Sequence, residues 1–221
     1  MLLAQTQPAC PTTGGTVEVP RLLVVADVDG AGGPVAWEGV LLRLAGLPPG
    51  LQVAVQVRAK GRPPAELRQL GAKARELLAD RVPVVLNGPP AVACTLRLAG
   101  VHWPEAEIPS AVPREAEGLL RSASVHGLVA VRRAQRVAHY VLFGPVFEPR
   151  SKPGTGAGVE ALRQACAASR LPVLAIGGVT AERVPLCVQA GAAGVAVVSA
   201  VVRAADPARE VLRLLDALPG G

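Results

Sequence analysis

The chain has 221 residues, half of them apolar and only 2% aromatic, so we expect one domain with a core of Ala, Val and Leu. Its net charge of +6 comes from scattered arginines rather than from a basic run interleaved with aromatic residues, which argues against nucleic-acid binding. No apolar stretch reaches the roughly 20 residues of a membrane span, and the first residues lack the basic-then-apolar pattern of a signal peptide, so we expect a cytoplasmic protein without a membrane partner.

Residues 1–20 contain Pro, Thr and Gly without periodicity, and we expect a flexible tail there, followed by one domain over 21–221. In that domain, short apolar runs alternate with helix-length segments, which is typical of parallel strands covered on both faces. The expected strands are 21–26, 51–60, 83–86, 100–105, 121–126, 140–143, 171–176 and 195–198. Helices or helix-like turns are expected at 38–45, 66–78, 91–98, 113–119 and 128–136.

Eight strand-then-helix units predict a single (β/α)8 TIM barrel, a fold of the α/β class. A doubly wound open sheet is the alternative, and it would usually show a G-x-G-x-x-G turn after the first strand. The segment "DVDGAGGP" is glycine-rich at that place, but Pro34 and the lack of an apolar helix start argue against such a turn. We therefore favour the barrel.

Two of the last expected strands end in residues that suit an anion. Gly177 and Gly178 follow the strand 171–176 and leave backbone N–H groups bare of side chains. Ser199 follows the strand 195–198 with a hydroxyl at the expected first turn of a helix, where unsatisfied N–H groups and the helix dipole favour negative charge. One glycine pair is equally compatible with a tight turn. Two such endings in consecutive strands favour a phosphate site, which in barrels often follows strands seven and eight.

Polar residues also stand at the ends of the other expected strands. Because the carboxyl ends of barrel strands surround one mouth, these residues should converge although they span most of the chain. Arg58 and Lys60 are by default solvated cations, but with Lys152 they would form a second anion pocket. The set comprises Asp27, Gln56, Arg58, Lys60, Asn87, Glu105 or Glu107, Ser124, His126 and Lys152.

Of the three histidines, His126 is the one that follows an apolar strand and precedes a helix at this mouth. An imidazole near a phosphate and a carboxylate can move protons at neutral pH. The alternation of side chains along a strand could instead point His102 into the barrel as a core residue, and His139 begins the next strand at the opposite end. We therefore expect a functional role for His126 and structural roles for the other two.

A family resemblance is carried by seven segments: "VQVRAK", "VVLNG", "GVHWPEAEIP", "SASVHGLVAVRRA", "YVLFGPVFEPRSK", "LPVLAIGG" and "AGAAGVAVVSA". In order and spacing they resemble the thiamine phosphate synthase/TenI superfamily, over about residues 22–217 and most densely from Ser122 onward. The resemblance implies a (β/α)8 barrel, which agrees with the eight units counted above. It also implies one of two activities, because the superfamily has two enzymatic branches.

Thiamine phosphate synthases join a pyrimidine methyl diphosphate to thiazole phosphate and release pyrophosphate with the help of magnesium. The resemblance assigns the diphosphate to the motif Gln56-x-Arg58-x-Lys60, and Lys152 matches the lysine of the long loop of the synthases. However, the Asn-Asp-Arg triplet of the synthases, whose aspartate binds magnesium, is replaced here by Asn87-Gly88-Pro89. The second magnesium aspartate corresponds to Glu107. One carboxylate of the metal site is thus missing and the other is a methylene longer.

The Asn-Gly pair, the Ser-Val-His segment and the Phe-Glu pair of the long loop look like the TenI branch, which includes metal-free thiazole tautomerases. The resemblance therefore implies first a tautomerase that acts on a small phosphorylated thiazole, with no cofactor. In it His126 would transfer the proton, and Lys152 or Arg58 would hold the substrate carboxylate. The remaining assignments are phosphate binding by Gly177, Gly178, Val198 and Ser199, and substrate binding by Gln56, Lys60, Asn87 and Ser124.

Two alternatives remain. One is a thiamine phosphate synthase with a degraded magnesium site, in which Glu107 would be the metal ligand; its best support is the retained Gln56-x-Arg58-x-Lys60 motif. The other is a non-catalytic regulator that binds thiazole or thiamine phosphate. The oligomeric state is open, with a homo-oligomer as one option.

Overall fold

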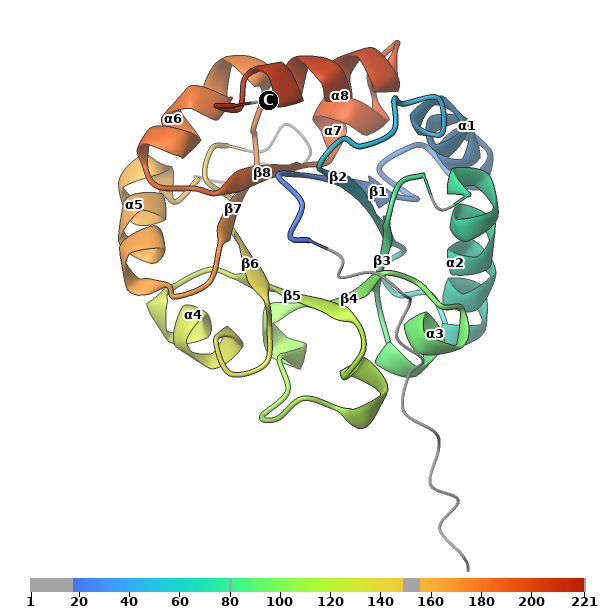
Figure 1. Ribbon diagram of the computed structural model, residues 1–221, viewed down its shortest axis with the longest axis horizontal. Coiled ribbons are helices and arrows are strands. Elements are labelled where there is room, and N and C mark those ends of the chain that lie inside the picture. The colour runs from blue at the N-terminus through green and yellow to red at the C-terminus, as the bar shows by residue number, and fades with distance from the viewer. Residues whose placement is uncertain (1–17, 80, 149–155, 221) are drawn as a thin grey trace, which may run out of the picture.

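The computed structural model describes residues 18–79, 81–148 and 156–220. Eight parallel strands close into a barrel in which each strand pairs with its neighbours in chain order, and β8 pairs with β1 (Figure 1). The predicted TIM barrel is thereby confirmed. The strands are β1 Leu22–Asp27, β2 Val53–Arg58, β3 Val84–Asn87, β4 Gly100–Trp103, β5 Leu120–Val125, β6 Tyr140–Phe143, β7 Val173–Ile176 and β8 Gly194–Val197.

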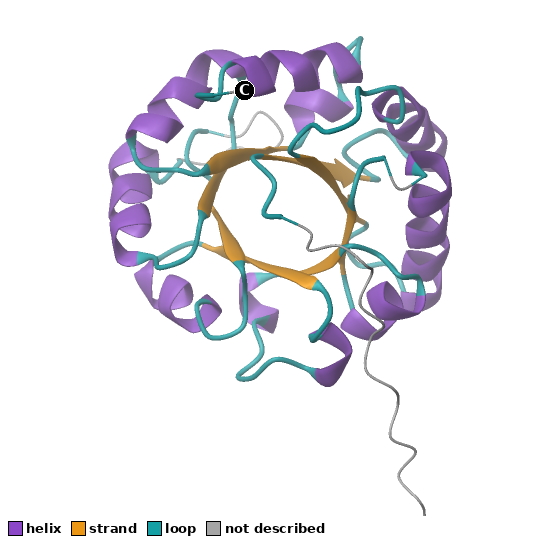
Figure 2. Cartoon of the chain, viewed as in Figure 1, coloured by secondary structure: helices purple, strands orange, loops and turns teal. Residues whose placement is uncertain are grey.

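Helices form a ring outside the barrel, as Figure 2 shows. Four of them, α1, α2, α3 and α8, begin with proline, whose fixed φ and missing N–H suit the first turn of a helix. The α-helices are α1 Pro34–Leu44, α2 Pro64–Leu78, α3 Pro90–Thr95, α4 Leu128–Ala134, α5 Gly158–Ala168, α6 Val184–Gln189, α7 Ser199–Val202 and α8 Pro207–Asp216.

β1 before Asp27, β6, β7 and β8 are continuous apolar runs buried on both faces, whereas β2 to β5 also contain polar residues. Alternate residues face outward and pack against the helices; Trp37 of α1 is fully buried and its Nε1–H donates a hydrogen bond to the Ala26 carbonyl oxygen at 3.0 Å. The other residues fill the barrel interior. This inner cluster consists of Leu23, Val25, Ala54, Leu120, Tyr140, Leu142, Leu174 and Ala196.

A polar layer lies in the same interior. Gln56, His102 and Ser122 are at most 2% exposed. The strand register places His102, Ser122 and Tyr140 side by side, because His102 pairs with Ser122, which in turn pairs with Tyr140. Side chains of a β-strand alternate between its two faces, so the residues two positions further along β2 and β5, Arg58 and Ser124, point to the carboxyl end of the barrel. The polar layer thus lies directly below the residues that face the carboxyl end of the barrel.

Most of the expected elements are confirmed with shifts of one to four residues at their ends, as for α1, which begins at Pro34 rather than at residue 38. The helix-like segment expected at 113–119 is wrong in extent: between β4 and β5 the described chain forms only two short 3-10 turns, η1 Glu105–Glu107 and η2 Arg114–Ala116. Gly118 disfavours a helix within the segment, and β5 already begins at Leu120, so only one short turn forms there.

The expected N-terminal tail falls mostly on residues 1–17, which lie outside the described residues, so the division at residue 20 stays a prediction. Within the described part, Val19 packs against the inner cluster of the barrel. Among the helices that the structure describes, none is both long and apolar enough to cross a membrane.

Candidate functional site

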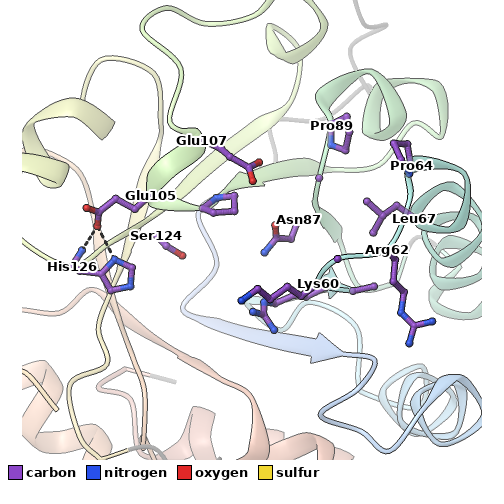
Figure 3. A pocket seen from close by; sticks show the side chains of 15 residues that line it. Lys60, Arg62, Pro64, Leu67, Asn87, Pro89, Glu105, Glu107, Ser124 and His126 are labelled. Carbon is purple, nitrogen blue, oxygen red and sulfur yellow. Dashed lines mark hydrogen bonds and ion pairs between the residues drawn. The ribbon is translucent and has the colours of Figure 1, made fainter. Parts of the chain in front are cut away.

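A cavity of about 630 Å³ opens at the carboxyl ends of β2, β3, β4 and β5 (Figure 3). It brings together seven of the residues that the sequence predicts at the mouth, namely Arg58, Lys60, Asn87, Glu105, Glu107, Ser124 and His126. The remaining lining residues include Arg62, Leu67, Gly88, Pro89 and Pro104. A set of side chains from four successive strand ends is what a small-molecule site in this fold requires.

One wall of the cavity carries three cations: Arg58, Lys60 and Arg62. The Arg58 guanidinium forms an ion pair with Asp27. Arg62 is paired with Glu66 of α2 and, at 2.7 Å, with Asp29. Within the described part of the chain, Lys60 has no such partner, and its side chain is exposed to the cavity. Lys60 is therefore the cation on this wall that is available to a ligand without breaking an ion pair.

Asp27 at the end of β1 explains why Arg58 is not a free cation. One oxygen of its largely buried carboxylate pairs with Arg58 on the neighbouring strand, and the other accepts the Gly30 N–H at 2.7 Å. A Cβ at position 30 would lie 3.0 Å from Asp27 Oδ1, so a larger residue there would crowd this carboxylate. Asp27 thus orients Arg58 and shapes the loop after β1 at the same time.

Across the cavity from Lys60, His126 is held by Glu105 (Figure 3). Glu105 Oε2 lies 2.7 Å from the His126 backbone N–H and 2.7 Å from its Nδ1. Because a carboxylate accepts, Nδ1 donates in this contact, and Nε2 is the ring nitrogen that remains for a ligand. The His126 side chain is 60% exposed, so this nitrogen is accessible to a ligand.

His102 lies beneath the cavity and not at its surface. Its ring contacts the hydroxyls of Ser122, at 2.9 Å from Nδ1, and Ser124, at 2.8 Å from Nε2. Burial, with a smaller contribution from the Arg58 charge, lowers the pKa of His102 to about 3. The expectation that His102 is a satisfied core residue is thus confirmed. His139 contacts the backbone N–H and the guanidinium of Arg121 at the other end of the barrel, which agrees with a structural role.

Gln56 and Asn87 belong to strands β2 and β3 at the base of the site. Asn87 lines the cavity, whereas Gln56 is 1% exposed inside the barrel and not part of the cavity wall. Its Nε2 is buried without a hydrogen-bond partner among the described atoms. A buried amide without a partner is costly, so Gln56 Nε2 is an unsatisfied donor inside the barrel.

The glycine turn after β7 has a packing role that the structure makes explicit. Gly177 and Gly178 have φ of 96° and 62°, and a Cβ on them would lie 2.5 Å from Pro145 Cα and 2.7 Å from the Glu148 carbonyl oxygen. The loop after β6 lies directly on the turn, with the Phe147 N–H donating to the Gly177 carbonyl oxygen at 3.0 Å. The two glycines therefore have a structural function, whether or not they also bind phosphate.

The phosphate-binding residues predicted from the sequence lie at the same end of the barrel but not in the cavity lining. Ser199 is the first residue of α7, as expected, and Val198 precedes it as the N-cap residue. These two residues and the glycine turn follow β8 and β7, whereas the cavity follows β2 to β5. Lys152 lies outside the described residues, so its predicted role in catalysis stays a prediction.

Two cationic contacts could not be recognised in the sequence. Arg62 comes from the loop after β2, where its position two residues beyond Lys60 is the only available signal. Arg183 donates to the Gly178 carbonyl oxygen at 2.7 Å and lies over the Phe147 ring, 4.9 Å from its centroid. Arg183 thereby connects the loop after β6 to the glycine turn, a cation–π contact that no local sequence pattern predicts.

Carboxylates are sparse around the cavity, which bears on metal binding. In the described ranges no group of three or more His, Cys, Asp or Glu side chains could hold a metal ion. Glu105 is engaged by His126, which leaves Glu107 as the uncommitted carboxylate of the lining, opposite the amide of Asn87. Magnesium is commonly held by one or two carboxylates together with substrate phosphates. These residues therefore fit magnesium only in a form in which a bound diphosphate supplies most of the ligands.

Comparison with known proteins places these observations in a family. Residues 43–201 match the family model described as thiamine monophosphate synthase. A putative thiamine-phosphate synthase of Geobacter sulfurreducens is 35% identical over 172 residues, which are 75% of this chain and 80% of the relative. The thiamine-phosphate synthase of Roseiflexus castenholzii is 37% identical over 170 residues, 74% of each chain.

Solved structures agree with the sequence relatives. The thiamine phosphate pyrophosphorylase of Pyrococcus furiosus superposes with a TM-score of 0.75 at 27% identity, and the match covers 92% of this chain and 97% of that one. A 3-hexulose-6-phosphate synthase superposes with a TM-score of 0.63 at 21% identity, covering 90% and 99%. The second likeness shows the barrel fold alone.

Proposed function

The chain belongs to the thiamine monophosphate synthase family, and from this premise we propose that it is a thiamine-phosphate synthase. It would join a pyrimidine methyl diphosphate to thiazole phosphate and release pyrophosphate. The names of the relatives support this activity over the tautomerase that the TenI-like segments led us to expect first. The wider function, an enzyme of thiamine biosynthesis, follows from membership of the family.

The observation that carries the proposal is the cation-lined cavity. A volume of about 630 Å³ lies within the usual range for a small-molecule site. Lys60, the cation on this wall without an internal ion pair among the described residues, and the donors that Arg58 and Arg62 retain beside it suit an anionic group such as a diphosphate. Their internal partners Asp27, Asp29 and Glu66 fix the two arginines in place before a ligand arrives.

Each residue has a definite part in the proposed reaction. Charge grows on the departing pyrophosphate as the bond between its oxygen and the methylene carbon breaks, and Lys60 would stabilise that charge. The thiazole nitrogen supplies the electron pair of the new bond to the methylene carbon. Its phosphate, anchored at the Gly178 turn and Ser199, would hold it in line. Glu107 would hold a magnesium ion against the diphosphate, and such an ion would neutralise charge on the leaving group.

A tautomerase remains a second candidate because one observation favours it. The Glu105–His126 pair leaves Nε2 of an exposed imidazole available in the cavity that Ser124 and Asn87 also line, and such an imidazole can move a proton. Gly88 also stands in the cavity wall where a synthase would carry a magnesium-binding aspartate. Proton transfer on a carboxythiazole phosphate would need neither that aspartate nor a metal.

One set of assays separates the two activities. Purified protein is given pyrimidine methyl diphosphate with thiazole phosphate, and in parallel carboxythiazole phosphate alone in chelator. We expect thiamine phosphate and pyrophosphate in the first reaction, and at least a hundredfold loss of that product for Lys60→Met but not for His126→Gln. Isomerisation in chelator that depends on His126, without formation of thiamine phosphate, would instead assign the tautomerase.

Magnesium binding is tested in a separate experiment. Calorimetry should detect magnesium binding only when pyrophosphate is present, and Glu107→Gln should weaken it about tenfold or more, since one carboxylate is then lost. Glu115→Gln, on η2 and outside the cavity lining, is the matched control. Tight magnesium binding by the protein alone would contradict the assignment of most ligands to the diphosphate.

A further inference from the structure

A histidine below the cavity floor contacts two serines of one strand. His102 on β4 is 2% exposed, and its Nδ1 and Nε2 lie 2.9 Å and 2.8 Å from the hydroxyl oxygens of Ser122 and Ser124. The two serines are two residues apart on β5 and therefore share the inner face of the barrel. Ser122 is fully buried, whereas Ser124 lines the cavity. The ring thus connects a buried hydroxyl to one that a ligand can reach.

In their hydrogen bonds to His102, one serine hydroxyl must accept and the other must donate. His102 is neutral at working pH, and a neutral imidazole has one N–H donor and one acceptor nitrogen. The Ser122 hydroxyl also lies 3.4 Å from the Val101 carbonyl oxygen, which can only accept. If the Ser122 proton points to Val101, the Ser122 oxygen accepts the Nδ1–H of His102. Nε2 then has no proton and accepts the hydroxyl proton of Ser124.

We propose that His102 is a positioning residue that fixes the direction of the Ser124 hydroxyl. The Ser124 proton then points to His102, and the lone pairs of the Ser124 oxygen face the cavity. A ligand group that contacts Ser124 must then bring a donor. An exocyclic amino group on a heterocyclic ring satisfies this requirement, whereas a phosphate or carboxylate oxygen does not. Ser124 would therefore select the aminopyrimidine part of a substrate and leave the anionic part to Lys60. Only this identification of the ligand rests on the proposed synthase function.

The first test is the protonation of His102 in the ligand-free protein. Nitrogen-15 spectra of histidine-labelled protein distinguish a protonated from an unprotonated ring nitrogen, and His102→Asn identifies the signals. We expect a protonated Nδ1 and an unprotonated Nε2, a shift toward protonated Nε2 in Ser122→Ala, and no such shift in Ser169→Ala, whose hydroxyl contacts Leu171 and not His102. A protonated Nε2 in the unaltered protein would overturn the proposal without touching the assignment of the activity.

The second test uses the ligand. In Ser124→Ala, His102→Asn and Ser122→Ala, the KM for the aminopyrimidine diphosphate should rise about threefold to tenfold, as expected for one lost hydrogen bond. Combining His102→Asn with Ser124→Ala should give no more than the Ser124→Ala effect, because His102 acts through Ser124. The affinity for a diphosphate that lacks the amino group should not depend on Ser124.

The outcomes separate the two proposals. The role of His102 and Ser124 would be rejected if the KM increases of the two single variants multiplied in the double variant. It would also be rejected if Ser124→Ala weakened binding of the ligand without its amino group by the same factor. Failure of the unaltered protein to bind or convert the aminopyrimidine diphosphate would reject the synthase. In that case the nitrogen-15 spectra would still decide whether His102 orients Ser124.

Discussion

Acid should destabilise this protein through His102 at a pH where most carboxylates are still ionised. The folded state holds this imidazole neutral, with a pKa of about 3 against 6.5 for an unperturbed histidine. Below pH 6.5 the His102 imidazole binds a proton in the unfolded chain but not in the folded protein. The stability due to the neutral ring is therefore complete above pH 6.5 and is lost progressively as the pH falls toward 3.

The magnitude follows from the two pKa values. At pH 5 the unfolded chain gains about 2 kcal/mol from protonating this histidine, and the loss approaches about 5 kcal/mol near pH 3. Domains of this kind unfold with free energies of about 5–15 kcal/mol, so the loss at pH 5 is measurable. His102→Asn removes the titrating group but keeps an amide that can donate to Ser122.

The assay is urea unfolding at pH 8 and pH 5, followed by the fluorescence of Trp37 and Trp103, both at most 4% exposed. The unaltered protein should lose about 2 kcal/mol more than His102→Asn between these pH values. Ser124→Ala, which retains His102, should behave like the unaltered protein. His139, whose pKa burial also lowers, is common to all three proteins and cancels. Equal pH dependence in His102→Asn and the unaltered protein would refute a neutral buried His102.

Three further changes test other parts of the structure. Lys60→Met should raise the KM for a diphosphate substrate at least tenfold, while Arg43→Met, an exposed cation on α1, should leave it unchanged; equal effects would show that only net charge matters. Gly178→Ala should cost about 1–3 kcal/mol in urea unfolding because φ is 62° and the Glu148 carbonyl oxygen is close, whereas Gly39→Ala, with open space in α1, should be neutral or stabilising; a neutral Gly178→Ala would remove the packing argument. Trp37→Phe should cost about 1–2 kcal/mol by thermal unfolding, since it leaves the Ala26 carbonyl without its buried donor, and an unchanged midpoint would show that the hydrogen bond contributes nothing.

Much of the architecture was already determined by the order of residue types. Eight strand-then-helix units, several of them with continuous apolar strands, predict a parallel barrel, because strands covered on both faces favour apolar sequence and eight such units close into a barrel. The same order places Lys60, Asn87 and His126 at the carboxyl ends of strands, and a barrel brings all such ends to one mouth. Local signals also located the start of α7 at Ser199.

The tertiary structure decided which polar groups are paired and which remain available. Arg58 is compensated by Asp27, which is 31 residues away, and His126 by Glu105, which is 21 residues away. The contact of His102 with Ser122 and Ser124 depends on the register between β4 and β5. Strand register is set by packing across the whole barrel, and an alternating pattern along one strand contains no information about its neighbour. For that reason the sequence could indicate which side chains meet at the mouth, but only the fold determines their charge and the direction of their protons.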